Sequence, residues 1–66
     1  MRVWLIAIRE NNKISQKEVA TRAKITQPSY CNIENGKRRP SVAVAKKIAA
    51  VLGFDWTRFY EEERGA

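Results

Sequence analysis

The amino-acid sequence predicts an all-α fold, a compact bundle of five helices. Helix-capping residues recur at short intervals, and no stretch alternates apolar and polar residues cleanly enough for a strand. The connections between the expected helices are only a few residues long, so consecutive helices must pack against each other. A chain of 66 residues allows one domain, expected at residues 1–60 and followed by a short acidic tail at residues 61–66.

The first two helices are predicted from their caps and from the spacing of apolar residues. The first covers roughly residues 2–11 and ends at the Asn pair that includes Asn12. Ser15 and Glu18 have the spacing of a capping box, in which Ser15 caps the second helix and Glu18 bonds back to its first amide. That helix is expected to run to about Ala23. The residues expected on the inner faces are Leu5, Ile8 and Arg9 in the first helix and Val19, Ala20 and Ala23 in the second.

A third helix is predicted between Thr26, its cap, and the pair Asn35-Gly36. Asn and Gly tolerate left-handed backbone, which suits the C-terminal end of a helix. Pro28 falls in the first turn, where its missing N–H is not needed. At 100° per residue, Tyr30 points inward together with Ile33.

The remaining chain holds a fourth helix and a last short turn. Pro40-Ser41 opens the helix, Gly53 stops it, and Asp55 caps the turn that follows. The core side of the fourth helix is expected to hold Val42, Ala45, Ile48, Ala49 and Leu52, and the turn holds Trp56, Phe59 and Tyr60.

Charge points to a polyanionic partner. The net charge is +6, and residues 1–60 hold twelve Lys and Arg against four Asp and Glu. Lys37, Arg38 and Arg39 stand in a row after Gly36. Their like charges repel one another unless a group outside the chain neutralises them.

Composition excludes several functional classes. With no histidine and a single cysteine, Cys31, we expect no zinc site, no internal disulfide and no cofactor, and a reducing, cytoplasmic location. The apolar run at residues 3–8 is too short for a signal peptide or a membrane span. The chain has no Gly-rich phosphate loop either, so we expect no enzyme. Cys31 is interpreted as a small residue that is tolerated on its helix.

The second and third helices are joined only by Lys24-Ile25-Thr26, too little for an antiparallel pair. A turn of this length sets two helices at a steep angle, which is the geometry of a helix-turn-helix. The segments SQKEVA, TQPS, IENGKRRP and IAAVLG, in this order, resemble the phage-repressor (Cro/C1, or Xre) type of helix-turn-helix DNA-binding domain. The resemblance spans Leu5 to about Tyr60. That family usually has glycine where this chain has Lys24.

The resemblance implies that the third helix lies in the major groove of DNA. Its outward residues then face base edges, and Gln and Asn side chains can pair with adenine. A proline ring can pack on a thymine methyl group. The expected base contacts are Gln27, Pro28 and Asn32.

The resemblance also implies which residues hold the phosphate backbone and which only support the fold. Expected phosphate contacts are Gln16, Lys17, Asn35, Lys37, Arg38 and Arg39, where the cations release counterions on binding. Gln16 is also expected to brace Gln27. Arg9 and Glu34 are expected to form a partly buried structural ion pair.

These observations predict a transcriptional regulator that binds duplex DNA sequence-specifically, acting as a repressor. The alternative is an antitoxin or controller protein of a toxin–antitoxin or restriction–modification pair, which binds a regulatory protein partner as well as DNA. A single recognition helix covers few base pairs, so we expect a homodimer on an operator with two half-sites. The interface is expected at Trp56, Phe59 and Tyr60, and no membrane partner is expected.

Overall fold

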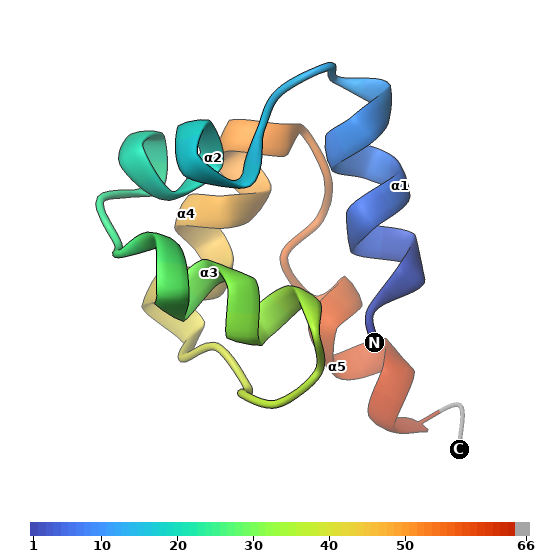
Figure 1. Ribbon diagram of the computed structural model, residues 1–66. Coiled ribbons are helices and arrows are strands. Elements are labelled where there is room, and N and C mark those ends of the chain that lie inside the picture. Colours follow the sequence, from blue (N-terminus) through green and yellow to red (C-terminus); the bar gives the residue numbers. More distant parts are fainter. Residues whose placement is uncertain (65–66) are drawn as a thin grey trace.

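Five helices and no strands make up the part of the chain that the structure describes (Figure 1). The computed structural model describes the backbone of residues 1–64 and the side chains of residues 1–61. This confirms the all-α prediction. The helices are α1 (Val3–Asn11), α2 (Gln16–Ala23), α3 (Gln27–Glu34), α4 (Val42–Leu52) and α5 (Arg58–Arg64).

Hydroxyl caps begin three of the helices, as predicted. The side chains of Ser15, Thr26 and Ser41 each accept a hydrogen bond from the backbone amide three residues later, at 3.1–3.3 Å. Each cap satisfies one of the amides that a helix start leaves without an intrahelical partner. The positions of α2, α3 and α4 therefore follow from local chemistry.

The capping box predicted at α2 forms only in part. Glu18 does not return to the first amide, because its Oε2 accepts a hydrogen bond from Arg22 Nε at 2.7 Å. An acid and a base four residues apart lie on the same helix face, and this pairing competes with the box. The cap at α2 therefore depends on the hydroxyl of Ser15.

Within residues 1–64, four residues with positive φ end the helices or turn the chain between them. Lys24 stands at φ 59° and ψ 41°, so it keeps the left-handed conformation in which the family usually has glycine. Gly36 follows α3 at φ 78°, and Gly53 ends α4 at φ 79°. Lys13, at φ 58° between α1 and α2, gave no signal in the sequence.

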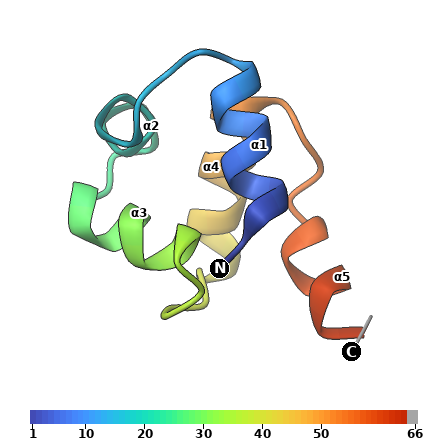
Figure 2. The same cartoon turned by 45° about the vertical axis from the view of Figure 1, so that its right-hand side comes forward.

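The core lies where α2 and α3 meet α1 and α4 (Figure 2). The inward residues predicted for the first four helices are buried or half-buried, with one exception. Val42 is 46% exposed, because it is the first residue of α4 and lies at the end of that helix, outside the core cluster. The core residues are Leu5, Val19, Ala20, Ala23, Tyr30, Ile33, Ala45, Ile48, Leu52 and Phe59.

Aromatic rings attach α5 to the rest of the bundle. The ring centroids of Trp4, Phe54 and Phe59 lie 5.1–5.7 Å from one another. Phe59 is only 2% exposed, so it belongs to the core of a single chain and cannot serve the dimer interface predicted for it. Trp56 and Tyr60 form a separate half-buried pair at 5.8 Å.

The last helix is longer than the short turn that the sequence predicts. It extends through Arg64 and so includes the acidic residues 61–63 of the predicted tail. Residues 65 and 66 of that tail lie outside the described residues. None of the described helices has the length and apolar content needed to cross a membrane.

Candidate nucleic-acid interface

The two faces of α3 differ sharply in exposure. Tyr30 and Ile33 are buried, whereas Gln27 and Pro28 are exposed and Asn32 is half-buried. Cys31 and Asn35 lie beside them, and the Asn35 amide donates to the Cys31 sulfur at 3.4 Å. The predicted orientation of α3 is therefore confirmed, while contact with DNA stays a prediction.

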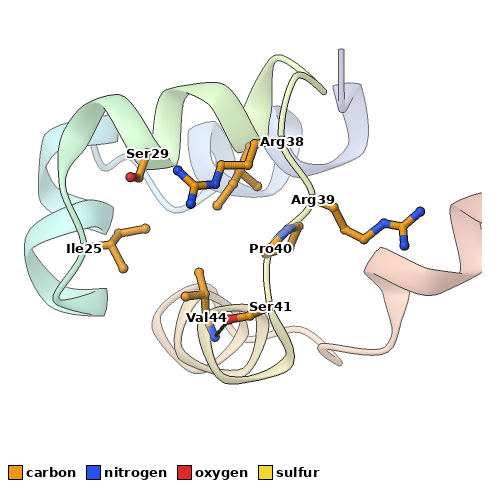
Figure 3. A pocket seen from close by; sticks show the side chains of 8 residues that line it. Ile25, Ser29, Arg38, Arg39, Pro40, Ser41 and Val44 are labelled. Atoms are coloured by element: carbon orange, nitrogen blue, oxygen red, sulfur yellow. Dashed lines mark hydrogen bonds between the residues drawn. The ribbon is translucent and has the colours of Figure 1, made fainter.

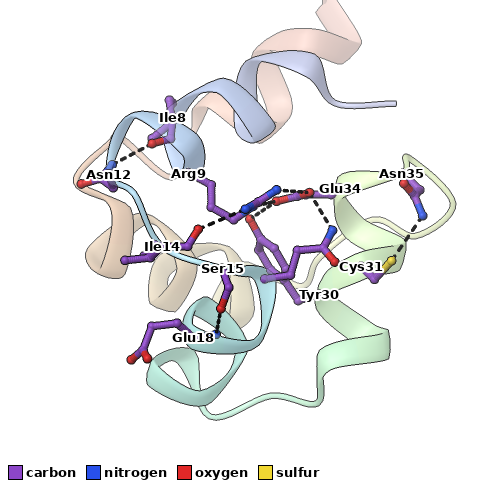
Figure 4. Close-up of polar contacts among 11 residues, drawn as sticks. Ile8, Arg9, Asn12, Ile14, Ser15, Glu18, Tyr30, Cys31, Glu34 and Asn35 are labelled. Carbon is purple, nitrogen blue, oxygen red and sulfur yellow. Dashed lines mark hydrogen bonds and ion pairs between the residues drawn. The ribbon is translucent and has the colours of Figure 1, made fainter.

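Glu34 forms the polar centre beneath this helix. It is 1% exposed, and its carboxylate accepts hydrogen bonds from Arg9 Nε at 2.5 Å and from the Tyr30 hydroxyl at 2.6 Å (Figure 4). Arg9 Nη1 donates to the carbonyl of Ile14 at 3.0 Å. The predicted Arg9–Glu34 ion pair is present, and among the described residues no buried side-chain nitrogen or oxygen lacks a partner.

Two members of this network were missed by the sequence analysis. The first is Tyr30, whose spacing of four residues from Glu34 could have indicated the contact. The second is Gln16, whose Nε2 donates to Glu34 Oε1 at 2.9 Å. Gln16 is thus directed at Glu34 and does not brace Gln27, because the buried carboxylate is the stronger acceptor.

The protonation of the network follows from its contacts. Burial by itself would raise the pKa of Glu34, but hydrogen bonds from Arg9, Tyr30 and Gln16 outweigh it and hold that pKa below its ordinary value. The hydrogen bond to Glu34 raises the pKa of Arg9. Burial and then the hydrogen bond to Glu34 raise the pKa of Tyr30. The network therefore holds one charged pair and a neutral phenol.

The cationic loop folds back onto the end of α3. The backbone amides of Lys37 and Arg38 both donate to the carbonyl of Asn32, at 3.0 and 3.2 Å. The two arginine side chains then diverge (Figure 3). Arg38 extends along a pocket between α3 and α4 towards Ser29, whereas Arg39 points towards α5.

The other predicted phosphate contacts lie at the N-terminal end of α2. Lys17 is exposed there, while Gln16 is half-buried through its bond to Glu34. No group of three or more His, Cys, Asp or Glu in the described part of the chain could hold a metal ion.

Figure 2 shows α2 end-on and α3 from the side, so these two short helices cross at a steep angle, and this arrangement agrees with the comparison to known families. A family model described as helix-turn-helix matches residues 5–59. The chain belongs to this helix-turn-helix family. The match confirms the resemblance to the Cro/C1 (Xre) type, and membership implies DNA binding and transcription regulation.

One curated relative is similar over most of its length. It is YqaF of Bacillus subtilis (strain 168), named an uncharacterized HTH-type transcriptional regulator. The two chains are 52% identical over 62 residues, which cover 94% of this chain and 82% of the relative. No solved structure matches the chain significantly.

Proposed function

We propose that this protein represses transcription by binding a specific duplex DNA sequence, with α3 lying in the major groove. The observation that supports this best is the polar side of α3 that faces away from the core. In Figure 1, α3 lies between α2, the helix that carries the exposed Lys17, and the loop at residues 36–41. Cations on both sides of a helix suit the two phosphate backbones that border a major groove.

Base recognition is assigned to three residues of the exposed face. Gln27 and Asn32 carry amide groups, which can form bidentate bonds with adenine. Pro28 donates no hydrogen bond, but its exposed ring fits a thymine methyl group. Together they would favour A·T pairs at the centre of the contact.

Phosphate binding is assigned to residues at the edges of this face. Lys17, Lys37, Arg38 and Arg39 supply charge, and Asn35 supplies an amide next to the loop. Gln16 is the first residue of α2, and we assign it a phosphate contact through its backbone amide, because backbone amides at the start of a helix can bond phosphate. Each cation lost should reduce the salt dependence of binding.

Repression would follow from occupancy of the site. One α3 covers few base pairs, so two copies on half-sites about 34 Å apart would give useful affinity. A bound pair then excludes other proteins from that stretch of duplex, and no further activity is required of the chain.

The test separates base reading from backbone binding. A preferred duplex is first selected from random sequences, and binding to it and to a scrambled duplex is then titrated at several salt concentrations. Asn32→Ala should cost about 1–3 kcal/mol on the selected duplex and little on the scrambled one. Arg38→Ala should weaken both and reduce the salt slope by about one unit.

Matched controls are available on other faces of the molecule. Asn11→Ala removes an exposed amide from α1, and Lys47→Ala removes an exposed cation from α4. If Asn32→Ala weakens both duplexes equally, α3 does not read bases. The protein would then be a non-specific binder or a partner-binding antitoxin or controller protein.

A further inference from the structure

Arg2 joins the end of α3 to the cationic loop. One nitrogen of its guanidinium, Nη1, donates both to the carbonyl of Ile33 and, at 3.1 Å, to the carbonyl of Arg38. Its backbone amide donates to the carbonyl of Glu34 at 2.7 Å. One residue thus bonds two carbonyls of the last turn of α3 and one carbonyl of the loop.

These contacts complete the hydrogen bonding at the C-terminal end of α3. A helix leaves its last four carbonyls without intrahelical donors. The Cys31 carbonyl accepts from Asn35, and the Asn32 carbonyl accepts from the two loop amides described above. The Ile33 carbonyl accepts from the Gly36 amide at 3.2 Å as well as from Arg2, and the Glu34 carbonyl accepts from the Arg2 amide. A cation at this end also interacts favourably with the helix dipole.

Neighbouring contacts hold Arg2 in place. Its guanidinium carbon lies 5.7 Å from the centre of the Phe59 ring, which belongs to the core. The chain also passes close to Gly36, since a Cβ atom there would lie only 3.2 Å from the backbone nitrogen of Met1. The guanidinium is therefore fixed between the core and the loop.

We propose that Arg2 is a positioning residue for DNA binding, which holds the loop where Lys37 and Arg38 meet the phosphate backbone. This inference rests on the proposed function. Arg2 acts through the loop carbonyl and not through its own contact with DNA. Without the Arg2 side chain, the loop and the side chains of Lys37 and Arg38 must become ordered when DNA binds. The conformational entropy lost in this ordering opposes binding.

The first measurement needs no DNA. Hydrogen–deuterium exchange compares the wild-type protein with Arg2→Ala, well below the melting temperature of the variant. The amides of Lys37 and Arg38 should exchange several-fold faster, relative to the amide of Ile48 in the core of α4. Unchanged exchange at these two amides would overturn the inference, whatever the DNA affinity.

The second measurement is binding to the selected and the scrambled duplex. Arg2→Ala should weaken both about threefold to tenfold, as expected when loop side chains must be ordered on binding. Lys47→Ala, which removes the same charge from α4, should change either affinity less. If Arg2 acted only through its positive charge, the Arg2→Lys variant would bind DNA as tightly as the wild type. Positioning through Nη1 predicts that it does not, because the lysine side chain is one bond shorter and its ammonium does not reach both carbonyls that Nη1 contacts.

A double-mutant cycle separates positioning from general stability. In a Lys37→Ala/Arg38→Ala background, Arg2→Ala should have little further effect, because the side chains that it positions are gone. A full additive loss would contradict the inference. If Arg38→Ala alone leaves binding unchanged, the phosphate assignment of the proposed function fails first. If Arg38→Ala weakens binding and Arg2→Ala does not, only the role of Arg2 fails.

Discussion

Glu34 shows at the scale of one residue how a buried charge can be retained in so small a domain. Its carboxylate is nearly inaccessible to water, and three side chains from α1, α2 and α3 donate to it. A buried ion pair is weak evidence for net stability, but removing one partner leaves the other buried and unpaired. The network therefore fixes the position of α3 relative to α1 and α2.

Glu34→Ala should lower the free energy of unfolding by about 3 kcal/mol, because Arg9 and Tyr30 lose their acceptor. Thermal denaturation should show a fall in Tm of roughly 10 °C or more for a domain of this size. Glu10→Ala, at an exposed acid of α1, is the control. A variant that melts within a degree or two of the wild type would show that the pair does not hold the fold.

The lowered pKa of Glu34 also predicts acid sensitivity. The folded carboxylate binds its proton less readily than the unfolded one. Its contribution to stability is present above the unfolded pKa of about 4.3 and is lost as the pH falls from there through the folded pKa. Urea denaturation at a series of acidic pH values should therefore show a steep loss of stability in the wild type.

The matching variant for this pH series is Glu34→Gln, which should give a flatter dependence. Some dependence should persist, because hydrogen bonds from the backbone and side chain of Thr57 lower the pKa of Asp55 as well. Equal slopes for Glu34→Gln and the wild type would assign the acid sensitivity to groups other than Glu34.

At the scale of the elements, the turn between α2 and α3 carries a strained residue. Lys24 adopts φ 59°, a conformation that places Cβ too close to its own backbone. The Lys24→Gly change should relieve this strain, which costs the folded state about 1–2 kcal/mol. Part of the gain in stability is lost again, because glycine gives the unfolded chain more conformational entropy than lysine does.

The expected net effect of Lys24→Gly is a stabilisation on the order of 0.5–1 kcal/mol, measured by denaturant unfolding. Lys13→Gly, at φ 58° in the preceding connection, should act in the same direction. If Lys24→Gly destabilises the protein, contacts of the lysine side chain outweigh the strain of its backbone.

At the scale of the whole molecule, we propose that the surface formed by Trp56 and Tyr60, at the start of α5, serves self-association. Trp56 and Tyr60 form a half-buried aromatic pair, and Lys46 lies 5.2 Å from the centre of the Trp56 ring. Phe59 is taken up by the core of one chain, so the proposed interface is reduced to the two half-buried rings.

We expect two chains per selected duplex, and a weaker second binding step in a Trp56→Ala/Tyr60→Ala variant. Sedimentation of the complex gives the stoichiometry, and titration gives the two binding steps. Asn11→Ala serves as the control, since it changes a surface on α1. One chain per duplex in the wild type would rule out the dimer.

The sequence by itself determined the first four helices, because caps, glycine stops and apolar spacing act within a few residues of one another. Ser15, Thr26 and Ser41 stand where the structure has caps, and the two faces of α3 follow from its period. Resemblance to a family added the Arg9–Glu34 pair. The prediction for Glu18 was wrong, because two groups close in sequence compete for its carboxylate: the first amide of α2 and the side chain of Arg22.

Only the tertiary structure decided which distant groups share a partner. Gln16 meets Glu34 across 18 positions, and Arg2 meets the carbonyl of Ile33 across 31. Both contacts depend on the angles at which helices cross, and those angles arise from the packing of whole faces rather than from any short pattern. The burial of Phe59 has the same cause, because it depends on the packing of the Phe59 ring in α5 against the Trp4 ring in α1.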